Sequence, residues 1–213
     1  MTENLKSNPA ERSIRLFRND FLESLTHVHP IVPLLFWTPV VLWLLWRAVT
    51  VHGIGAPALV GVAVLALFVW TLAEYLLHRF VFHFQAESRL GKYLIFMFHG
   101  VHHDAPRDKT RLVMPPAGAI IVLLLLWQLF ALVIPSPWIE PFFAFFILSY
   151  LGYDYIHYAT HHFPMRHPAL HFLKVYHLQH HYGAKGLRYG VTSPLWDHVF
   201  GTSPEPSTAA QSR

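Results

Sequence analysis

The sequence has no cysteine and little charge. Without cysteine, a metal site would have no thiolate ligands, which disfavours a closed structural zinc site because such sites usually use cysteine. Asp, Glu, Lys and Arg together make up 13% of the residues, about half the share found in an average soluble domain. Hydrophobic residues reach 54%. This composition excludes an ordinary soluble protein and predicts a membrane protein.

Four apolar segments are candidates for membrane-spanning helices. Segments 54–77 and 112–134 each reach the ~20 residues that a helix needs to cross the hydrocarbon core of a bilayer. Segments 31–46 and 138–155 are shorter but rich in Trp, Phe and Leu, and we expect them to span as well. The sequence thus predicts an all-α membrane protein with about four transmembrane helices in two hairpins and a cytosolic helical cap that carries the histidine clusters. In the alternative, either hairpin dips into the membrane and returns without crossing it.

The distribution of positive charge predicts the orientation. If all four segments cross, the N-terminus, the loop 79–111 and the residues after 155 share one side of the membrane. Fifteen of the 16 Lys and Arg residues lie on that side, and Arg47 is the exception. The positive-inside rule assigns this side to the cytoplasm, and the lack of cysteine favours a bacterial inner membrane. The net charge of +4 then reflects topology and contact with anionic lipid, and no nucleic-acid partner is expected.

The chain divides into three parts. Residues 1–30 are expected to form a polar tail followed by an amphipathic helix over 11–25, which would lie on the membrane surface. Residues 31–202 would form the integral membrane domain, and residues 203–213 a disordered tail. No secretory signal peptide is expected, because the first long apolar segment starts near residue 31 and no small-residue cleavage site follows it.

Histidine is unusually abundant: the chain has 17, and ten of them form four clusters. Imidazole is the commonest metal ligand in proteins. In three clusters, spacings of three or four residues place the rings on one face of a helix, one turn apart. Ten imidazoles exceed the capacity of one ion, so the pattern predicts two metal ions with about five ligands each. The candidate ligands are His78, His83, His99, His102, His103, His157, His161, His177, His180 and His181.

The remaining cluster has a different spacing. His78 and His83 are five residues apart, which is about 140° around an α-helix of 3.6 residues per turn. Their rings can converge only if the helix ends or bends between them. The sequence therefore predicts a departure from regular α-helix between these two residues.

The ligand type narrows the choice of metal. A site of imidazoles without clustered carboxylates or thiolates suits iron, zinc, copper or nickel, and it disfavours magnesium and calcium. Two adjacent iron ions that activate O2 explain ten histidines more economically than a structural zinc site does. Such ligands bind zinc more tightly than they bind ferrous iron, so we expect that zinc can occupy the site in the isolated protein.

Two buried carboxylates are predicted to support the imidazoles. A metal-bound imidazole usually donates its other N–H to a carboxylate or a carbonyl group. Glu74 lies one turn before His78, and Asp154 lies three residues before His157. Both lie in apolar segments, where ionisable groups are costly and usually functional. Asp197 is a further candidate, with helix capping or turn formation as its alternative role.

Five blocks of sequence carry a family resemblance: HRFVFH (78–83), FHGVHHDAPRDKTRLVMPP (98–116), YDYIHYATHH (153–162), KVYHLQHHY (174–182) and GVTSPLWDHVFGT (190–202). Together they resemble the fatty acid 2-hydroxylase branch of the membrane fatty acid hydroxylase and sterol desaturase superfamily, over about residues 60–202. The histidine pattern is typical of the whole superfamily. The RLVMPP and GVTSPLWDHVFGT blocks favour the 2-hydroxylase branch.

The resemblance implies a membrane-bound, O2-dependent mono-oxygenase that hydroxylates carbon 2 of a long fatty acyl chain, free or amide-linked in a sphingolipid. It implies that the ten histidines hold a dinuclear metal centre, with no catalytic side chain beyond it. His162 is an alternative ligand to His161. We prefer His161, because it lies four residues after His157. Eukaryotic relatives often carry a haem-binding electron-donor domain with an HPGG motif, whereas His29-Pro30 is not followed by glycine here. A separate electron-donor protein is therefore implied.

The histidine pattern leaves two alternatives open. Other members of the superfamily hydroxylate or desaturate sterols and carotenoids, and they share the histidines, so only the flanking blocks favour an acyl substrate. A non-redox zinc membrane hydrolase would need an activated water and a nearby general base. Glu74 is the only buried candidate for such a base.

Overall fold

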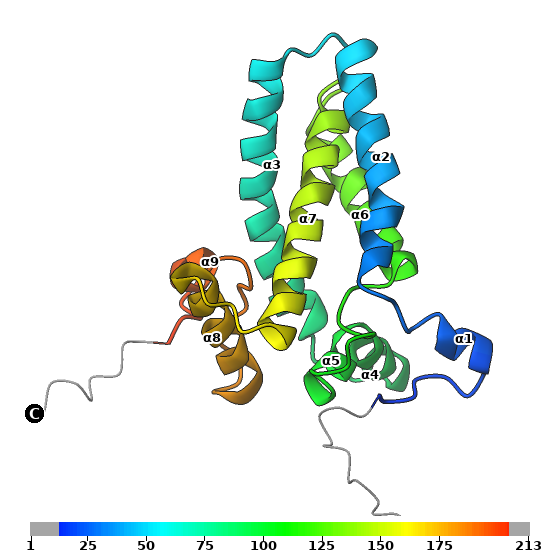
Figure 1. Cartoon of the computed structure of the whole chain (residues 1–213), viewed down its shortest axis with the longest axis vertical. Coiled ribbons are helices and arrows are strands. Elements are labelled where there is room, and N and C mark those ends of the chain that lie inside the picture. The colour runs from blue at the N-terminus through cyan, green and yellow to red at the C-terminus, as the bar shows by residue number, and fades with distance from the viewer. Residues whose placement is uncertain (1–12, 205–213) are drawn as a thin grey trace, which may run out of the picture.

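The computed structural model describes residues 13–204, and within this range every regular element is helical and no strand is present (Figure 1). The helices are α1 (Asp20–Ser24), α2 (Ile31–Thr50), α3 (Ala56–Leu76), α4 (Arg89–Ile95), α5 (Val101–Asp104), α6 (Pro116–Ala131), α7 (Ile139–His162), α8 (Pro168–Tyr182) and α9 (Leu195–Val199). Two π-helical segments, η2 (Leu77–Phe82) and η3 (Phe96–Gly100), continue α3 and α4. The all-helical prediction is confirmed for the described residues.

The long helices form one elongated body with α7 at its centre. Helix α7 contacts α2, α3 and α6, and the short helices gather around one end of the body (Figure 1). Aromatic side chains dominate the core between α3 and α7, where the ring of Trp70 meets that of Phe146 edge-on at a centroid distance of 5.1 Å. Such pairs contribute about 0.5–1.5 kcal/mol beyond the burial of their area. This packing fixes the end of α7, which carries two of the predicted ligands.

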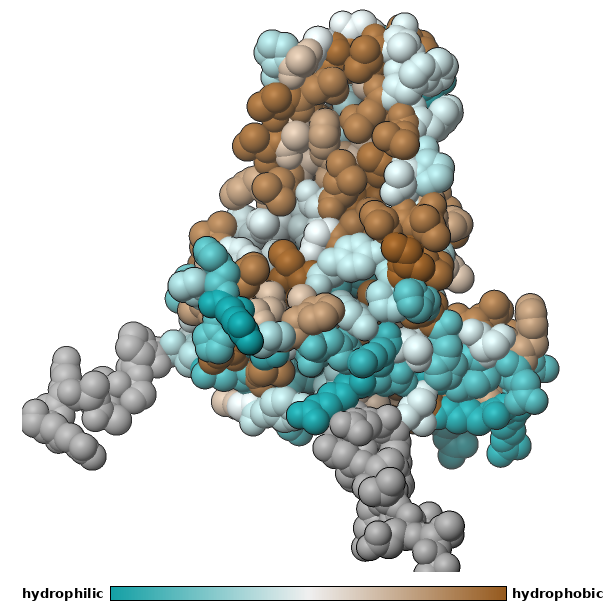
Figure 2. Space-filling model, in the orientation of Figure 1, coloured by the Kyte–Doolittle hydropathy of each residue, from teal (hydrophilic) through white to brown (hydrophobic). Residues whose placement is uncertain are grey.

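The surface of the body is apolar. Helix α2 and the continuous segment Ala56–Phe82 are long and apolar enough to cross a membrane, and α6 is a shorter apolar helix. Large hydrophobic side chains point outward along these helices: Leu42 is 60% exposed, Val64 64% and Leu125 67%. Figure 2 shows hydrophobic side chains over the body and hydrophilic ones around the end that carries the short helices. A continuous exposed apolar surface of this kind indicates a membrane protein rather than a buried core helix.

The N-terminal helix is shorter than predicted. A helix was expected over 11–25, but within the described residues it covers only Asp20–Ser24. The side chain of Asn19 caps it by accepting the backbone N–H groups of Phe21 and Leu22. The carboxylate of Glu23 accepts hydrogen bonds from two earlier backbone N–H groups, at residues 16 and 17, and so holds that stretch outside the helix. The predicted polar tail, 1–10, and nearly all of the predicted disordered tail, 203–213, lie outside the described residues.

Candidate metal centre

A π-helical turn brings the first two histidines together. In η2 the backbone N–H of His83 donates to the carbonyl of His78, five residues earlier, at 3.2 Å. This i→i+5 bond is the defining bond of a π-helix, and it aligns residues that an α-helix would separate. The two ring centroids lie 5.0 Å apart. The predicted departure from regular helix is thus a π turn, and η3, which carries His99, is a second one.

The ten predicted histidines meet at the end of the body in two groups of five. The first group is His78, His83, His99, His103 and His180, and the second group is His102, His157, His161, His177 and His181. Within each group the nearest ring nitrogens all lie within 4.8 Å of one another. The groups are neighbours, since the rings of His103 and His181 stack at a centroid distance of 4.1 Å. Both groups therefore share one interior, to which α5, α7, α8, η2 and η3 contribute histidines and His83 directly follows η2.

The spacing of the nitrogens fits a shared metal ion. In the first group, Nε2 of His99 lies 3.1 Å from Nε2 of His78 and 2.9 Å from Nε2 of His103. In the second, Nε2 of His102 lies 2.9 Å from the same atom of both His157 and His181. Two nitrogens bound at right angles to one ion at about 2.1 Å would lie about 3.0 Å apart. Nitrogen ligands of this number suit iron, zinc or copper, so the residues present fit two such ions.

The histidines are held in their neutral, metal-binding form. Burial lowers the pKa of His99 and of His177 well below its ordinary value, and the charges of neighbouring imidazoles lower it further. The same causes lower the pKa of His103 to about 3. Desolvation disfavours the charged imidazolium. At neutral pH these rings therefore carry a free lone pair for a metal ion.

Two histidines of the first group are oriented by backbone carbonyls. Nδ1 of His78 donates to the carbonyl of Tyr189, and Nδ1 of His180 donates to the carbonyl of Leu187 at 2.9 Å. A proton on Nδ1 leaves the lone pair of Nε2 pointing into the group. No sequence pattern pointed to these two acceptors, because a main-chain carbonyl can belong to any residue type.

The carboxylates have other partners than predicted. Glu74 accepts hydrogen bonds from the backbone N–H groups of Val191 and Thr192, and from the Thr192 hydroxyl, instead of from an imidazole. Asp154 accepts from the backbone N–H of Met114 at 3.3 Å. Among the described residues, the hydrogen bonds of Glu74 and Asp154 thus come from backbone N–H groups and a hydroxyl, and their support of the metal centre stays a prediction. The physical reason is that residues outside regular helices leave N–H groups without helical partners, and buried carboxylates satisfy them.

Asp197, the further candidate, also binds backbone. Its two carboxylate oxygens accept from the N–H groups of Tyr189 and Gly190, at 2.8 and 2.7 Å. Asp197 is fully buried. Asp197 therefore does not contact His78. It holds the backbone of Tyr189, and the carbonyl of Tyr189 accepts the Nδ1 proton of His78.

The structure distinguishes between the two adjacent histidines at the end of α7. His161 belongs to the second group, and its Nε2 lies 2.9 Å from Nε2 of His177. The ring of His162 instead packs on Tyr158 at a centroid distance of 4.4 Å and belongs to neither group. The geometry agrees with the preference for His161, and the role of the ten histidines as ligands stays a prediction.

A largely apolar cavity of about 280 Å3 opens beside the histidines. His99, His102 and His157 form part of its wall, so it touches both groups. Its size is near the lower end of the range of small-molecule sites, about 300–1,000 Å3. The other wall residues include Leu16, Phe17, Leu22, Leu25, Phe98, Leu112 and Ile121. The N-terminal segment 13–27 thus closes one side of this cavity.

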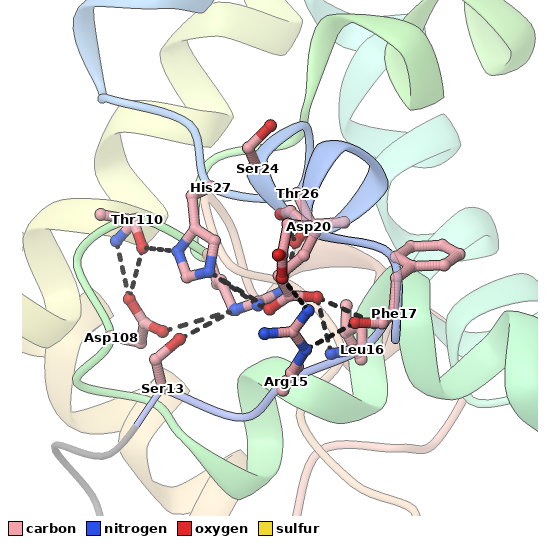
Figure 3. A network of polar contacts seen from close by, with 12 residues as sticks. Ser13, Arg15, Leu16, Phe17, Asp20, Ser24, Thr26, His27, Asp108 and Thr110 are labelled. Carbon is pink, nitrogen blue, oxygen red and sulfur yellow. Dashed lines mark hydrogen bonds and ion pairs between the residues drawn. The ribbon is translucent and has the colours of Figure 1, made fainter.

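A buried arginine ties this segment to the rest of the chain. Arg111, with a side chain 2% exposed, forms an ion pair with Glu23 and donates to the hydroxyl of Thr26 at 2.7 Å. The network extends through His27, whose Nδ1 lies 2.7 Å from the hydroxyl of Thr110 (Figure 3). Bonds from one guanidinium to several residues of the segment hold the cavity wall in place.

Comparison with known proteins agrees with this site. The sequence model of the family "Fatty acid hydroxylase" matches residues 63–202. A dihydroceramide fatty acyl 2-hydroxylase of Arabidopsis thaliana is 42% identical over 192 residues, covering 89% of this chain and 80% of the relative. A ceramide very long chain fatty acid hydroxylase of Saccharomyces cerevisiae is 42% identical over 194 residues, covering 89% and 49%. The fatty acid 2-hydroxylase of Homo sapiens is 36% identical over 220 residues, covering 92% and 59%.

The chain thus spans about half the length of the yeast relative and most of the plant one. A solved structure of full-length scs7p, in which only the hydroxylase domain is visible, superposes with a TM-score of 0.81. It is 38% identical and covers 90% of this chain and 72% of that one. The resemblance stated from the sequence is confirmed. The chain belongs to the fatty acid hydroxylase family and is an oxidoreductase of the hydroxylase type.

Proposed function

We propose that this protein is a membrane-bound, O2-dependent mono-oxygenase that hydroxylates carbon 2 of a long fatty acyl chain, free or amide-linked in a sphingolipid. The observation that carries the proposal is the apolar cavity whose wall includes histidines of both groups. The ten histidines would hold two iron ions, which zinc can replace in isolated protein. When bound, the irons would supply the O2 activation needed to attack an unactivated C–H bond.

The chain's own residues would bind and position the substrate. Apolar side chains of the cavity would hold the acyl chain and exclude water from the reacting carbon. His99, His102 and His157 would face that carbon from the cavity wall. Both the plant and the yeast relatives are named for acyl chains of dihydroceramide or ceramide, which favours an acyl amide as the substrate class.

Topology and partners complete the proposal. Helices α2, α3, α6 and α7 would cross the membrane as two hairpins, with the histidines facing the cytoplasm of a bacterial inner membrane. Helix α6 has 16 residues, which at 1.5 Å per residue rise about 24 Å, less than the ~30 Å hydrocarbon core. A complete crossing would therefore need the apolar residues that flank α6. Residues 1–30, 31–202 and 203–213 remain our division of the chain, and a separate protein would donate electrons.

The decisive experiment is lipid mass spectrometry on cells with and without the gene, grown under oxygen-18 gas. We expect acyl lipids that gain one hydroxyl next to the carbonyl, with the label in that hydroxyl. Label arriving from water would contradict a mono-oxygenase and favour the zinc hydrolase. A hydroxylated sterol or carotenoid without an acyl product would retain the reaction type and replace the substrate.

A further inference from the structure

The segment between α8 and α9 is not helical, and two carboxylates hold the backbone of its inner part, where Tyr189, Gly190 and Val191 are buried. Five consecutive N–H groups, from residue 188 to residue 192, all donate hydrogen bonds. The first bonds to the carbonyl of Thr202 at 3.0 Å. The next two bond to Asp197 and the last two to Glu74, at 2.6–2.8 Å. Charge-assisted bonds of this kind are about twice as strong as neutral ones.

The carbonyls of the same segment face the first histidine group. Leu187 and Tyr189 accept the Nδ1 protons of His180 and His78. Arg188, between them, has a φ of 62°, in the left-handed region. A non-glycine residue in this region is strained and persists only where its surroundings impose the conformation. The anchoring bonds on the N–H side provide those surroundings.

Gly190 shows how closely the carboxylate approaches the segment. A Cβ atom at this position would lie 2.0 Å from the carbonyl oxygen of Ser193 and 3.0 Å from Oδ2 of Asp197. The distance to the carbonyl oxygen is shorter than any real Cβ contact, so the backbone would have to shift to admit a side chain. A side chain at position 190 would therefore displace the backbone whose N–H groups bond to Asp197.

We infer that Asp197 and Glu74 are positioning residues for the first histidine group only, acting through the backbone of residues 188–192. This inference rests on the proposed two-metal centre. Loss of the groups that orient a ligand imidazole lowers metal affinity about 10–100-fold. In the second group, Nδ1 of His102, His177 and His181 is buried and has no hydrogen-bond partner among the described residues. Disturbing the segment should therefore weaken one metal position and spare the other.

The two carboxylates offer a matched pair of substitutions. Asp197 accepts backbone N–H groups with both oxygens, so Asp197→Asn would turn an NH2 group toward an N–H donor. Glu74 accepts both of its backbone bonds with Oε1. In Glu74→Gln that oxygen remains, and the new NH2 group can donate to the Thr192 hydroxyl. The first substitution should release the segment and the second should retain it.

The test measures metal per chain on the purified full-length protein, loaded anaerobically with iron-57 and dialysed against chelators of increasing strength. We expect two irons in the wild type and in Glu74→Gln, and one iron in Asp197→Asn at a chelator strength that leaves the wild type full. The Mössbauer spectrum of Asp197→Asn should lose one of two iron signals. Asp108→Asn removes another buried carboxylate that accepts a backbone N–H, and it should retain both irons.

The outcomes separate this inference from the proposed function. A wild type that never holds two metals contradicts the proposed function itself. A wild type with two metals, together with an Asp197→Asn protein that retains both or loses both equally, overturns the inference alone. If Asp197→Asn does not accumulate in the membrane, the wild type still decides, because its irons should leave in two steps. Two variants assign these steps, because each removes one ligand candidate from one group. We expect His83→Ala to lose the later step, which belongs to the first group, and His161→Ala to lose the earlier one. Release of both irons from the wild type in a single step overturns the inference.

Discussion

The two histidine groups have the same number of imidazoles and similar nitrogen spacing, but they are held in different ways. Four of the five histidines of the second group lie in α7 and α8: His157, His161, His177 and His181. The first group depends on two π turns and on carbonyls from a non-helical segment. Helix packing alone can orient ligands where the helices are long. Where the backbone is irregular, hydrogen bonds from residues distant in the sequence orient the ligands instead.

The largest expected effect removes a ligand candidate from either group. His102→Ala and His180→Ala should each abolish formation of the hydroxylated acyl lipid while the protein remains in the membrane, because the packed long helices do not depend on the histidines. Product is measured by lipid mass spectrometry and membrane content by immunoblot. His162→Ala, a change in a histidine of neither group, is the control and should retain activity. Retained activity in either group variant would contradict a joint role of the groups.

The next effect compares two glycines. Gly190→Ala forces a Cβ into the carbonyl of Ser193 and should weaken iron in the first group about 10–100-fold. Gly152→Ala, in α7, meets nothing within 4 Å. It should leave both irons bound and raise stability by about 0.5–1 kcal/mol, since alanine favours a helix over glycine. Iron content and the unfolding midpoint in detergent are the measurements, and equal iron loss in both variants would refute the distinction.

A smaller effect concerns two arginines of the N-terminal network. Arg111 is buried, whereas the side chain of Arg15 is 54% exposed in its pair with Asp20. Arg111→Gln removes the ion pair with Glu23, whose carboxylate keeps its bonds to the backbone N–H groups of Leu16 and Phe17, so we expect a loss of about 1–2 kcal/mol. We expect faster proteolysis of segment 13–27 and a higher KM for the acyl substrate. Arg15→Gln should match the wild type within about 0.5 kcal/mol, and equal proteolysis of both variants would disprove the assigned role of Arg111.

The smallest expected effect is a loss of folded stability at acidic pH, and both histidine groups should contribute to it. Burial first, and then neighbouring imidazoles, lower the pKa of His103 to about 3, from an ordinary value near 6.5. Between these values the unfolded chain binds more protons than the folded one, so folded stability is lost as the pH falls from 6.5 toward 3. The metal-free protein should therefore melt a few degrees lower at pH 5 than at pH 7.5. A melting temperature that rises on acidification would contradict buried neutral imidazoles.

Local patterns predicted the parts of the structure that depend on local geometry. The apolar segments became α2, α3, α6 and α7, and helical spacing placed His157 and His161 on one face. The partners of Glu74 were not predictable, because they lie 117 and 118 residues further along the chain. The stripe over 11–25 suggested a helix, but Glu23 bonds to backbone that a helix would have used itself. Contacts between distant segments overrode the pattern there.

The π turn has a consequence for how this protein can adapt to its bilayer. Because α3 continues into η2 without a break, one continuous helical segment runs from Ala56 to Phe82, includes His78 and ends next to His83. One residue inserted in α3 would rotate the far end by about 100° and advance it by about 1.5 Å. Helix α2 ends in a turn and carries no histidine of either group, so it can gain or lose residues without moving one of those ten. The length of α2 can therefore change to match a thicker or thinner membrane, whereas a change in the length of α3 would move the histidines that follow it.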